Sequence, residues 1–144
     1  MSSRLIRLQY GFVSQSFDPY NMTLPWQTST RDGLFKMNYT PEGGMRDNLK
    51  FWANTNKGEY VMDPNFGLDV RRYLFDPIPV LKDNIIHNAR EQLPIYFPEL
   101  KPVIIEVLTH EEISEISENT VIFKLRAVYK TDKNRRVELE ESIG

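Results

Sequence analysis

The residues that could do acid–base chemistry are scattered along this 144-residue chain. A glycosidase needs two carboxyl groups that face each other across a cleft. The chain offers several carboxylates, none within a catalytic motif: Asp63, Asp69, Asp76, Glu99, Glu106 and Glu111. Because most Asp and Glu side chains in soluble proteins are exposed, solvated surface is the favoured interpretation. A cell-wall hydrolase, lysozyme-like and using a carboxylate pair, stays open as the alternative function.

The two histidines, His87 and His110, are far apart and lack the spacing of metal ligands. His87 has acidic residues four positions away on either side, which is ordinary pairing on a helix surface. The sequence has no Gly-x-Ser-x-Gly elbow and no phosphate-binding P-loop. We therefore expect no catalytic site, no cofactor and no bound metal.

Composition excludes further classes of protein. The absence of cysteine excludes disulfides, thiol catalysis and Cys-ligated metals. No run of about 18 apolar residues is present, and the first residues lack the features of a signal peptide. Eighteen basic and twenty acidic residues give a net charge of −2, without the basic footprint of a nucleic-acid binder. We expect no nucleic acid and no membrane among the partners, which leaves an enzyme, a binding module or part of an assembly.

The elements that would position any site divide into two parts. Residues 1–47 lack a sustained helical or alternating period, and prolines interrupt them. Single large apolar residues punctuate this stretch, and we expect an extended N-terminal arm anchored by Phe17, Trp26 and Phe35. A loop-rich N-terminal lobe is the alternative. Residues 48–144 form the predicted folded domain.

The first half of that domain predicts a short hairpin and two helices. Alternation at residues 49–53, a turn cluster at 54–58 and residues 59–62 favour the hairpin. Apolar spacing predicts a short helix over 66–74. A second helix is expected over 78–92, with Asp76 as its N-cap and Pro94 ending it.

The second half predicts strands. The β-branched run 103–109 suits a buried strand, and residues 120–130 alternate between apolar and polar side chains. Residues 135–141 alternate again after a turn. The predicted fold class is α+β: a short hairpin, two helices and a C-terminal antiparallel three-stranded meander, preceded by the arm.

Residues 57–76 resemble the signature of a known family. The pattern is a Gly after a turn, then Asp-Pro-x-Phe-Gly, then a short helix that ends in Leu-Phe-Asp. The residues that carry it are Gly58, Asp63, Pro64, Phe66, Gly67, Leu74 and Phe75. It resembles the baseplate wedge family of contractile tails, which includes myophage sheath initiators and the TssE component of type VI secretion. The resemblance covers residues 48–131, and the signature's large apolar residues are expected to pin the short helix to the sheet.

The resemblance implies a structural subunit of a contractile phage tail baseplate, and no enzyme. Such a subunit joins wedge proteins near the tail tube and initiates the sheath. Its implied partners are other baseplate wedge proteins, the tail sheath protein and tail tube or hub proteins. The implied location is the virion tail, assembled in the host cytoplasm.

Two surfaces follow from the same resemblance. Family members often carry Glu-Pro-Arg after the long helix, a motif linked to the wedge's core bundle. Here the matching residues are Tyr96, Phe97, Pro98 and Glu99, so an apolar contact through the two aromatic residues could replace the charged one. The last strand is the expected sheath-facing edge, because an edge strand can accept a strand from another chain. Its residues are Arg136, Val137, Glu138, Leu139 and Glu140.

Overall fold

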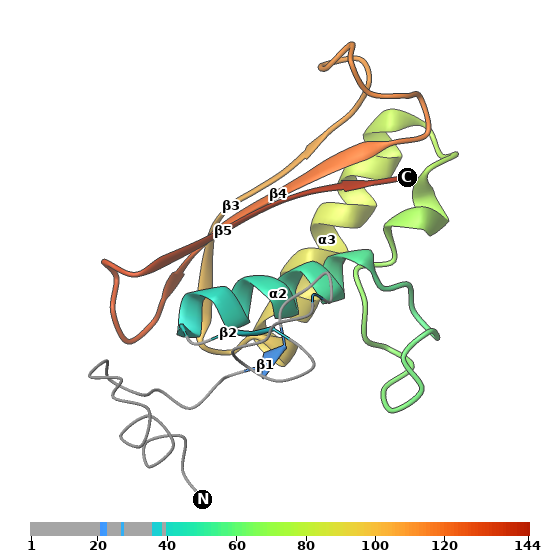
Figure 1. The fold of residues 1–144 in the computed structure, drawn as a ribbon. Helices are drawn as coiled ribbons and strands as arrows, with labels where there is room; N and C mark the ends of the chain where they lie inside the picture. Colours follow the sequence, from blue (N-terminus) through green and yellow to red (C-terminus); the bar gives the residue numbers. More distant parts are fainter. Residues whose placement is uncertain (1–20, 23–26, 28–35, 39) are drawn as a thin grey trace, which may run out of the picture. The chain divides into compact units, whose positions relative to one another are not determined.

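The computed structural model describes residues 21–22, 27, 36–38 and 40–144. The chain divides into two compact units, residues 1–47 and 48–144. The helix α2 (Pro41–Asn54) runs across the boundary between them. Figure 1 shows the elements of both units along the chain.

In the first unit, β1 (Asn21–Met22) pairs antiparallel with β2 (Met37–Asn38). Thr40 caps the start of α2, because its Oγ1 accepts a hydrogen bond of 3.2 Å from the Gly43 N–H. Residues 41–47 are therefore helical, and the extended arm predicted up to residue 47 is wrong for these seven positions. The predicted anchors Phe17, Trp26 and Phe35 lie outside the described residues.

The second unit begins with the remainder of α2, where a hairpin was predicted. Leu49, Trp52 and Ala53 are all at most 1% exposed, whereas Phe51 is 46% exposed. Burial at i, i+3 and i+4 is the helical period, so the alternation seen in five residues was misleading. Residues 55–69 then form a loop, with turns in place of the predicted second hairpin strand.

The next two elements are a 3₁₀ helix η1 (Val70–Tyr73) and the long helix α3 (Ile78–Tyr96). Asp76 does not cap α3: the N-cap is Pro77, and it makes no side-chain hydrogen bond. Pro79 lies in the first turn and lacks an N–H, so a side-chain cap would have fewer donors to satisfy. Pro94 lies inside the last turn of α3 and does not end the helix. Its missing N–H removes a single backbone hydrogen bond there. The helix closes with the Phe97 N–H on the Leu93 carbonyl at 2.8 Å.

A three-stranded antiparallel sheet completes the unit, in the predicted order β3–β4–β5. The strands are β3 (Leu100–Leu108), β4 (Val121–Tyr129) and β5 (Arg136–Ile143). The predicted alternation in β4 is confirmed, because its odd-numbered residues are buried and its even-numbered residues lie on the other face. The α+β class and the C-terminal meander are therefore confirmed.

The core lies between one face of the sheet and the helices (Figure 1). The fully buried Trp52 ring packs edge-on against Phe97 and Phe123, with centroids 5.8 and 6.0 Å away. Leu81, Ile85 and Leu93 of α3 are at most 3% exposed on the same apolar stripe. The sheet's opposite face carries most of its charged side chains.

Candidate functional site

The loop 55–69 is closed by the first signature residues. Gly58 has φ +90° and donates its N–H to the Pro64 carbonyl at 2.8 Å. The Asp63 carboxylate accepts the Asn65 N–H at 3.1 Å and the Tyr96 hydroxyl at 2.8 Å. Burial, then the hydrogen bond to Asp63, raises the pKa of Tyr96 above its ordinary value. Asp63 thus ties the loop to the end of α3.

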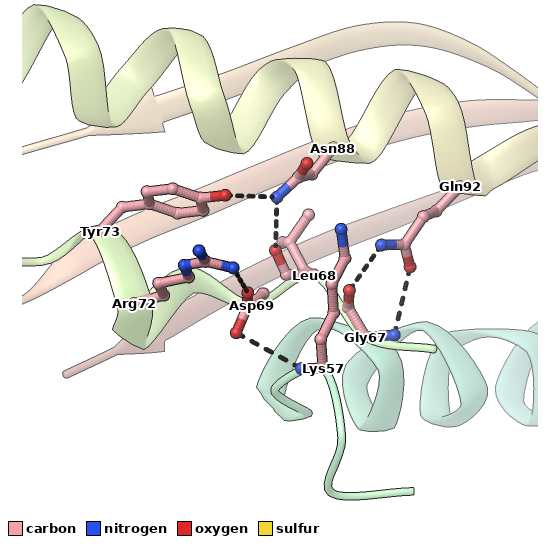
Figure 2. A network of polar contacts seen from close by, with 8 residues as sticks. All are labelled: Lys57, Gly67, Leu68, Asp69, Arg72, Tyr73, Asn88 and Gln92. Atoms are coloured by element: carbon pink, nitrogen blue, oxygen red, sulfur yellow. Dashed lines mark hydrogen bonds and ion pairs between the residues drawn. The ribbon is translucent and has the colours of Figure 1, made fainter. Parts of the chain in front are cut away.

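Gly67 is the most constrained position of the loop. Its φ is +123°, and an added Cβ would lie 2.5 Å from the Thr55 carbonyl oxygen. The Gln92 side chain of α3 binds both backbone groups of Gly67 (Figure 2): Oε1 accepts its N–H at 3.1 Å, and Nε2 donates to its carbonyl at 2.7 Å. The indole N–H of Trp52 donates to the same Oε1 at 2.9 Å. Three segments of the unit therefore meet at one buried amide.

A second polar contact lies one turn earlier on α3. Asn88 donates from Nδ2 to the Leu68 carbonyl at 3.5 Å and to the Tyr73 hydroxyl at 3.4 Å (Figure 2). Asp69, 5% exposed and with φ 61°, accepts the Lys57 N–H at 3.3 Å and lies 3.8 Å from Arg72. We call Gly67, Gln92, Trp52, Asn88 and Asp69 the loop clamp.

Sequence reasoning missed the two α3 members of this clamp. Asn88 and Gln92 are each 6% exposed, on the same stripe as the buried Ile85 and Ala89. A polar amide on an apolar helix stripe was the available signal, because buried amides need hydrogen-bond partners. The partners themselves were invisible, since Gly67 lies 25 residues earlier.

The large residues of the signature have different environments. Phe66 packs among Phe51, Tyr60 and Tyr96, at centroid distances of 5.8, 5.2 and 5.0 Å. Leu74 is half-buried. Phe75 is 83% exposed, so the expectation that it pins the short helix to the sheet is wrong. Leu74 and Phe75 form a turn between η1 and α3.

The residues predicted to contact a core bundle are partly internal. Phe97 is 6% exposed against Trp52, and Tyr96 is bound to Asp63. Phe97 is therefore packed within this chain, whereas Tyr96 is half-buried and keeps part of its side chain exposed. A core-bundle contact through these residues stays a prediction. Pro98 and Glu99 are exposed, although the Glu99 carbonyl accepts the Lys130 N–H at 2.9 Å.

The predicted sheath-facing residues lie on β5, an edge strand of the described sheet. The Tyr129 N–H donates to the Arg135 carbonyl at 3.1 Å, so this pair is hydrogen-bonded. Hydrogen-bonded and non-bonded pairs alternate along an antiparallel pair of strands. In this register, backbone hydrogen bonds to β4 are made by Val137, Leu139, Glu141 and Ile143. The N–H and C=O groups of Arg136, Glu138, Glu140 and Ser142 therefore point away from β4, toward the edge of the sheet where no strand of the described residues pairs. We call this the free edge.

Val137 and Leu139 are buried, at 1% and 5% exposure. Arg136, Glu138 and Glu140 instead lie on the outer face, where two ion pairs join β4 to β5 and a third lies within β5. Arg126 lies 2.9 Å from Glu138, Lys124 lies 3.3 Å from Glu140, and Arg136 lies 3.9 Å from Glu138. A hollow of about 420 Å³ opens on this face between residues of all three strands: Ile104, Glu106, Lys124, Leu125, Arg126, Glu138, Leu139 and Glu140.

The candidate catalytic residues lie on several different elements of the described chain. Asp63 and Asp69 hold the loop, and Glu106 lies on the outer face of the sheet. His87 pairs with Glu91 at 3.1 Å on the exposed side of α3. Among the residues that the structure describes, no cluster of three His, Cys, Asp or Glu could hold a metal, and no helix could cross a membrane.

A comparison of the sequence with models of known protein families finds a match. Residues 44–134 match the family described as baseplate wedge protein gp25. The chain belongs to this family. The match begins inside α2 and ends in the β4–β5 turn, so it includes the loop clamp. Members of this family are structural components of the tail baseplate.

Two solved structures share the fold. A crystal structure from Geobacter sulfurreducens, of a protein provisionally named a tail lysozyme, has a TM-score of 0.58 and 19% identity. The similarity covers 72% of this chain and 89% of that one. A chain in the cryo-EM structure of the anti-feeding prophage baseplate has a TM-score of 0.53 and 15% identity, covering 85% of this chain and 82% of that one. No curated protein matches the chain.

Proposed function

We propose that this chain joins wedge proteins near the tail tube of a contractile-tail baseplate and initiates the sheath at the free edge of β5. The observation that carries the proposal is an unbroken row of outward backbone groups on β5. The proposed partners are other baseplate wedge proteins, the tail sheath protein, and tail tube or hub proteins. The particle would be assembled in the host cytoplasm.

The other edge of the sheet, β3, is poorly suited to strand addition. The Lys130 N–H bonds to the Glu99 carbonyl, so Lys101 faces β4 and Pro102 faces outward. Proline has no N–H to offer a partner, and a bulge follows between Pro102 and Ile104. The two edges are therefore unequal, and β5 is the edge on which a strand can pair over its full length.

A different surface suits the wedge proteins. Ile95 near the end of α3 is 69% exposed, and Pro98 and Glu99 follow it. At the tip of the loop, Val61 and Met62 are 91% and 85% exposed. Single exposed apolar residues are common, but apolar residues at both places favour contact with a neighbouring subunit. We assign the wedge contact to this end of the unit and the sheath contact to β5.

The test is a proline on the β5 edge. Glu138→Pro removes an outward N–H that the fold does not use, so the core residues of β5 stay in place. Baseplates assembled with this variant are expected to contain the chain but to carry no sheath in electron micrographs. Glu138→Ala removes the carboxylate and keeps the N–H, and its tails are expected to be sheathed.

Lys133→Pro is the matched control. The Arg135 N–H donates to the Asp132 carbonyl at 3.1 Å, so Lys133 is the second residue of a turn, a position that suits proline. Tails with Lys133→Pro should be sheathed. Normally sheathed tails with Glu138→Pro would contradict sheath initiation at β5.

A further inference from the structure

Charged side chains form two ordered rows across the outer face of the sheet. In one row, Glu106 of β3 pairs in register with Lys124, which pairs with Glu140 of β5. In the other, Ile104 pairs with Arg126, which pairs with Glu138. Charge alternates in sign across all three strands in the first row and between β4 and β5 in the second, and each row ends on a carboxylate of β5.

These terminal carboxylates are available to a further strand. Glu138 and Glu140 keep 52% and 62% of their side chains exposed, although each pairs with a cation of β4. Arg136 is 69% exposed and sits one step along the same edge. Their outward backbone groups mean that an added strand would place its own side chains directly opposite these three.

We infer that the segment which adds to β5 carries basic side chains opposite Glu138 and Glu140 and an acidic side chain opposite Arg136. This inference rests on the proposed function of the β5 edge and specifies the partner's charge pattern. A cation opposite each carboxylate continues the alternation across the sheet. A carboxylate there would face like charge, which is destabilising in a cross-strand pair.

The hollow on the outer face supports the same assignment. Its lining includes both terminal carboxylates and Glu106 of β3. Lysine and arginine have long apolar stems that can lie along a surface while the charged head reaches a carboxylate. Basic side chains from an added strand can therefore lie across the edge into this concave face. Between them, apolar residues of the strand would continue the buried row of Val137 and Leu139.

The test uses the full chain and three labelled peptides that pair antiparallel with β5. The basic peptide is Thr-Val-Lys-Val-Lys-Val-Glu, which sets its lysines opposite Glu140 and Glu138 and its glutamate opposite Arg136. The acidic peptide, Thr-Val-Glu-Val-Glu-Val-Lys, reverses every charge. The third is the basic peptide with both lysine amides N-methylated, which blocks backbone pairing. Binding is measured by fluorescence anisotropy.

The basic peptide should bind on the order of tenfold more tightly than the acidic one at low salt, with the difference shrinking at 1 M salt. The double variant Glu138→Lys with Glu140→Lys should reverse this preference. The control Glu115→Lys with Glu118→Lys makes the same change of net charge in the exposed loop between β3 and β4, and it should keep the preference.

The outcomes separate the charge pattern from the edge itself. Equal binding of the basic and acidic peptides, with loss on N-methylation, would overturn the charge inference and leave β5 as the binding edge. Binding of the N-methylated peptide as tightly as the basic one would overturn both the inference and strand addition at β5. Absence of binding by both unmethylated peptides, or an unchanged preference in the double variant at residues 138 and 140, also overturns the inference.

Discussion

The loop clamp and the β5 edge handle polar groups in opposite ways. At the clamp, Gln92 is 6% exposed and satisfies both backbone groups of Gly67 and the indole N–H of Trp52. At the edge, Glu138 is 52% exposed, and its backbone groups have no partner among the described residues. The clamp completes its hydrogen bonds within the chain, whereas the edge presents backbone groups of the kind that a strand from another molecule can pair with.

This contrast shows which role the residues of the family signature have. Gly58, Asp63, Pro64 and Gly67 all serve the loop and its attachment to α3. They hold the fold, and none of them provides the free edge. Surfaces proposed to meet other subunits lie elsewhere, on β5 and on the exposed residues at the loop tip and the end of α3. Variants at the clamp should therefore lower stability, and variants at the edge should lower assembly.

The largest expected effect is at Gly67. Gly67→Ala forces a Cβ to within 2.5 Å of the Thr55 carbonyl at a φ of +123°, and we expect a loss of about 4 kcal/mol in the free energy of unfolding. Urea denaturation of the purified chain measures it. Gly58→Ala is the matched control, because φ is +90° but no atom lies within 4 Å of the added Cβ. Its cost should be only about 1–2 kcal/mol. Equal costs would show that close approach to Thr55 does not matter.

Gln92→Ala comes next. It leaves the Gly67 N–H, the Gly67 carbonyl and the Trp52 N–H without their partner, and buried unsatisfied groups are costly. We expect the free energy of unfolding to fall by about 3 kcal/mol. The neighbouring Glu91→Ala, on an exposed side chain, should change it by less than about 0.5 kcal/mol. A Gln92 variant as stable as the Glu91 variant would remove the clamp from the account.

Tyr96→Phe tests the contact between the loop 55–69 and the end of α3. Loss of the hydroxyl bond to Asp63 should cost about 1 kcal/mol at neutral pH. The pKa of Tyr96 is raised in the folded chain, so its stabilisation is complete below the unfolded value near 10 and is lost as pH rises through the folded pKa. The wild type should therefore lose stability relative to the variant above about pH 10. The free energies of unfolding of both proteins are measured by denaturation from pH 7 to 11. A difference between them that stays constant over this range would contradict the prediction.

The smallest expected effect on stability is at the edge. Glu138→Ala with Glu140→Ala removes exposed ion pairs to Arg126 and Lys124, which are worth little in water. The free energy of unfolding should fall by at most about 1 kcal/mol, less than for Gln92→Ala alone. A larger loss would mean that these carboxylates serve the fold, and the distinction between clamp and edge would not hold.

The sequence predicted the sheet well and α2 badly, because the pattern in the sheet is long and the pattern in α2 is short. The alternation in β4 runs for nine residues and matches a strand with one buried face. In α2, the five residues from Leu49 to Ala53 fit both periods. The first turn of α2 contains Gly43 and Gly44, and glycine disfavours a helix. What decides is the burial of Trp52 against Phe97 and Phe123, which lie 45 and 71 residues later.

The β5 edge and the loop clamp were each predictable in part. The position of β5 at an edge of the described sheet followed from the predicted three-stranded antiparallel meander, in which the third strand pairs with the second. The inequality of the two edges did not, because it depends on the direction in which Pro102 faces and on the bulge beside it. The clamp was half visible: Gly67 stood out in the sequence, but its binding to Gln92 depends on how α3 crosses the loop.

The most direct test of the account is a cryo-EM map of the sheathed tail in which this chain is located. We predict that it lies in the baseplate, with a strand from a sheath subunit hydrogen-bonded to Arg136, Glu138, Glu140 and Ser142 of β5, and with the β3 edge unoccupied by a strand. A bare β5 edge beside assembled sheath, or a sheath strand paired on β3, would contradict the account.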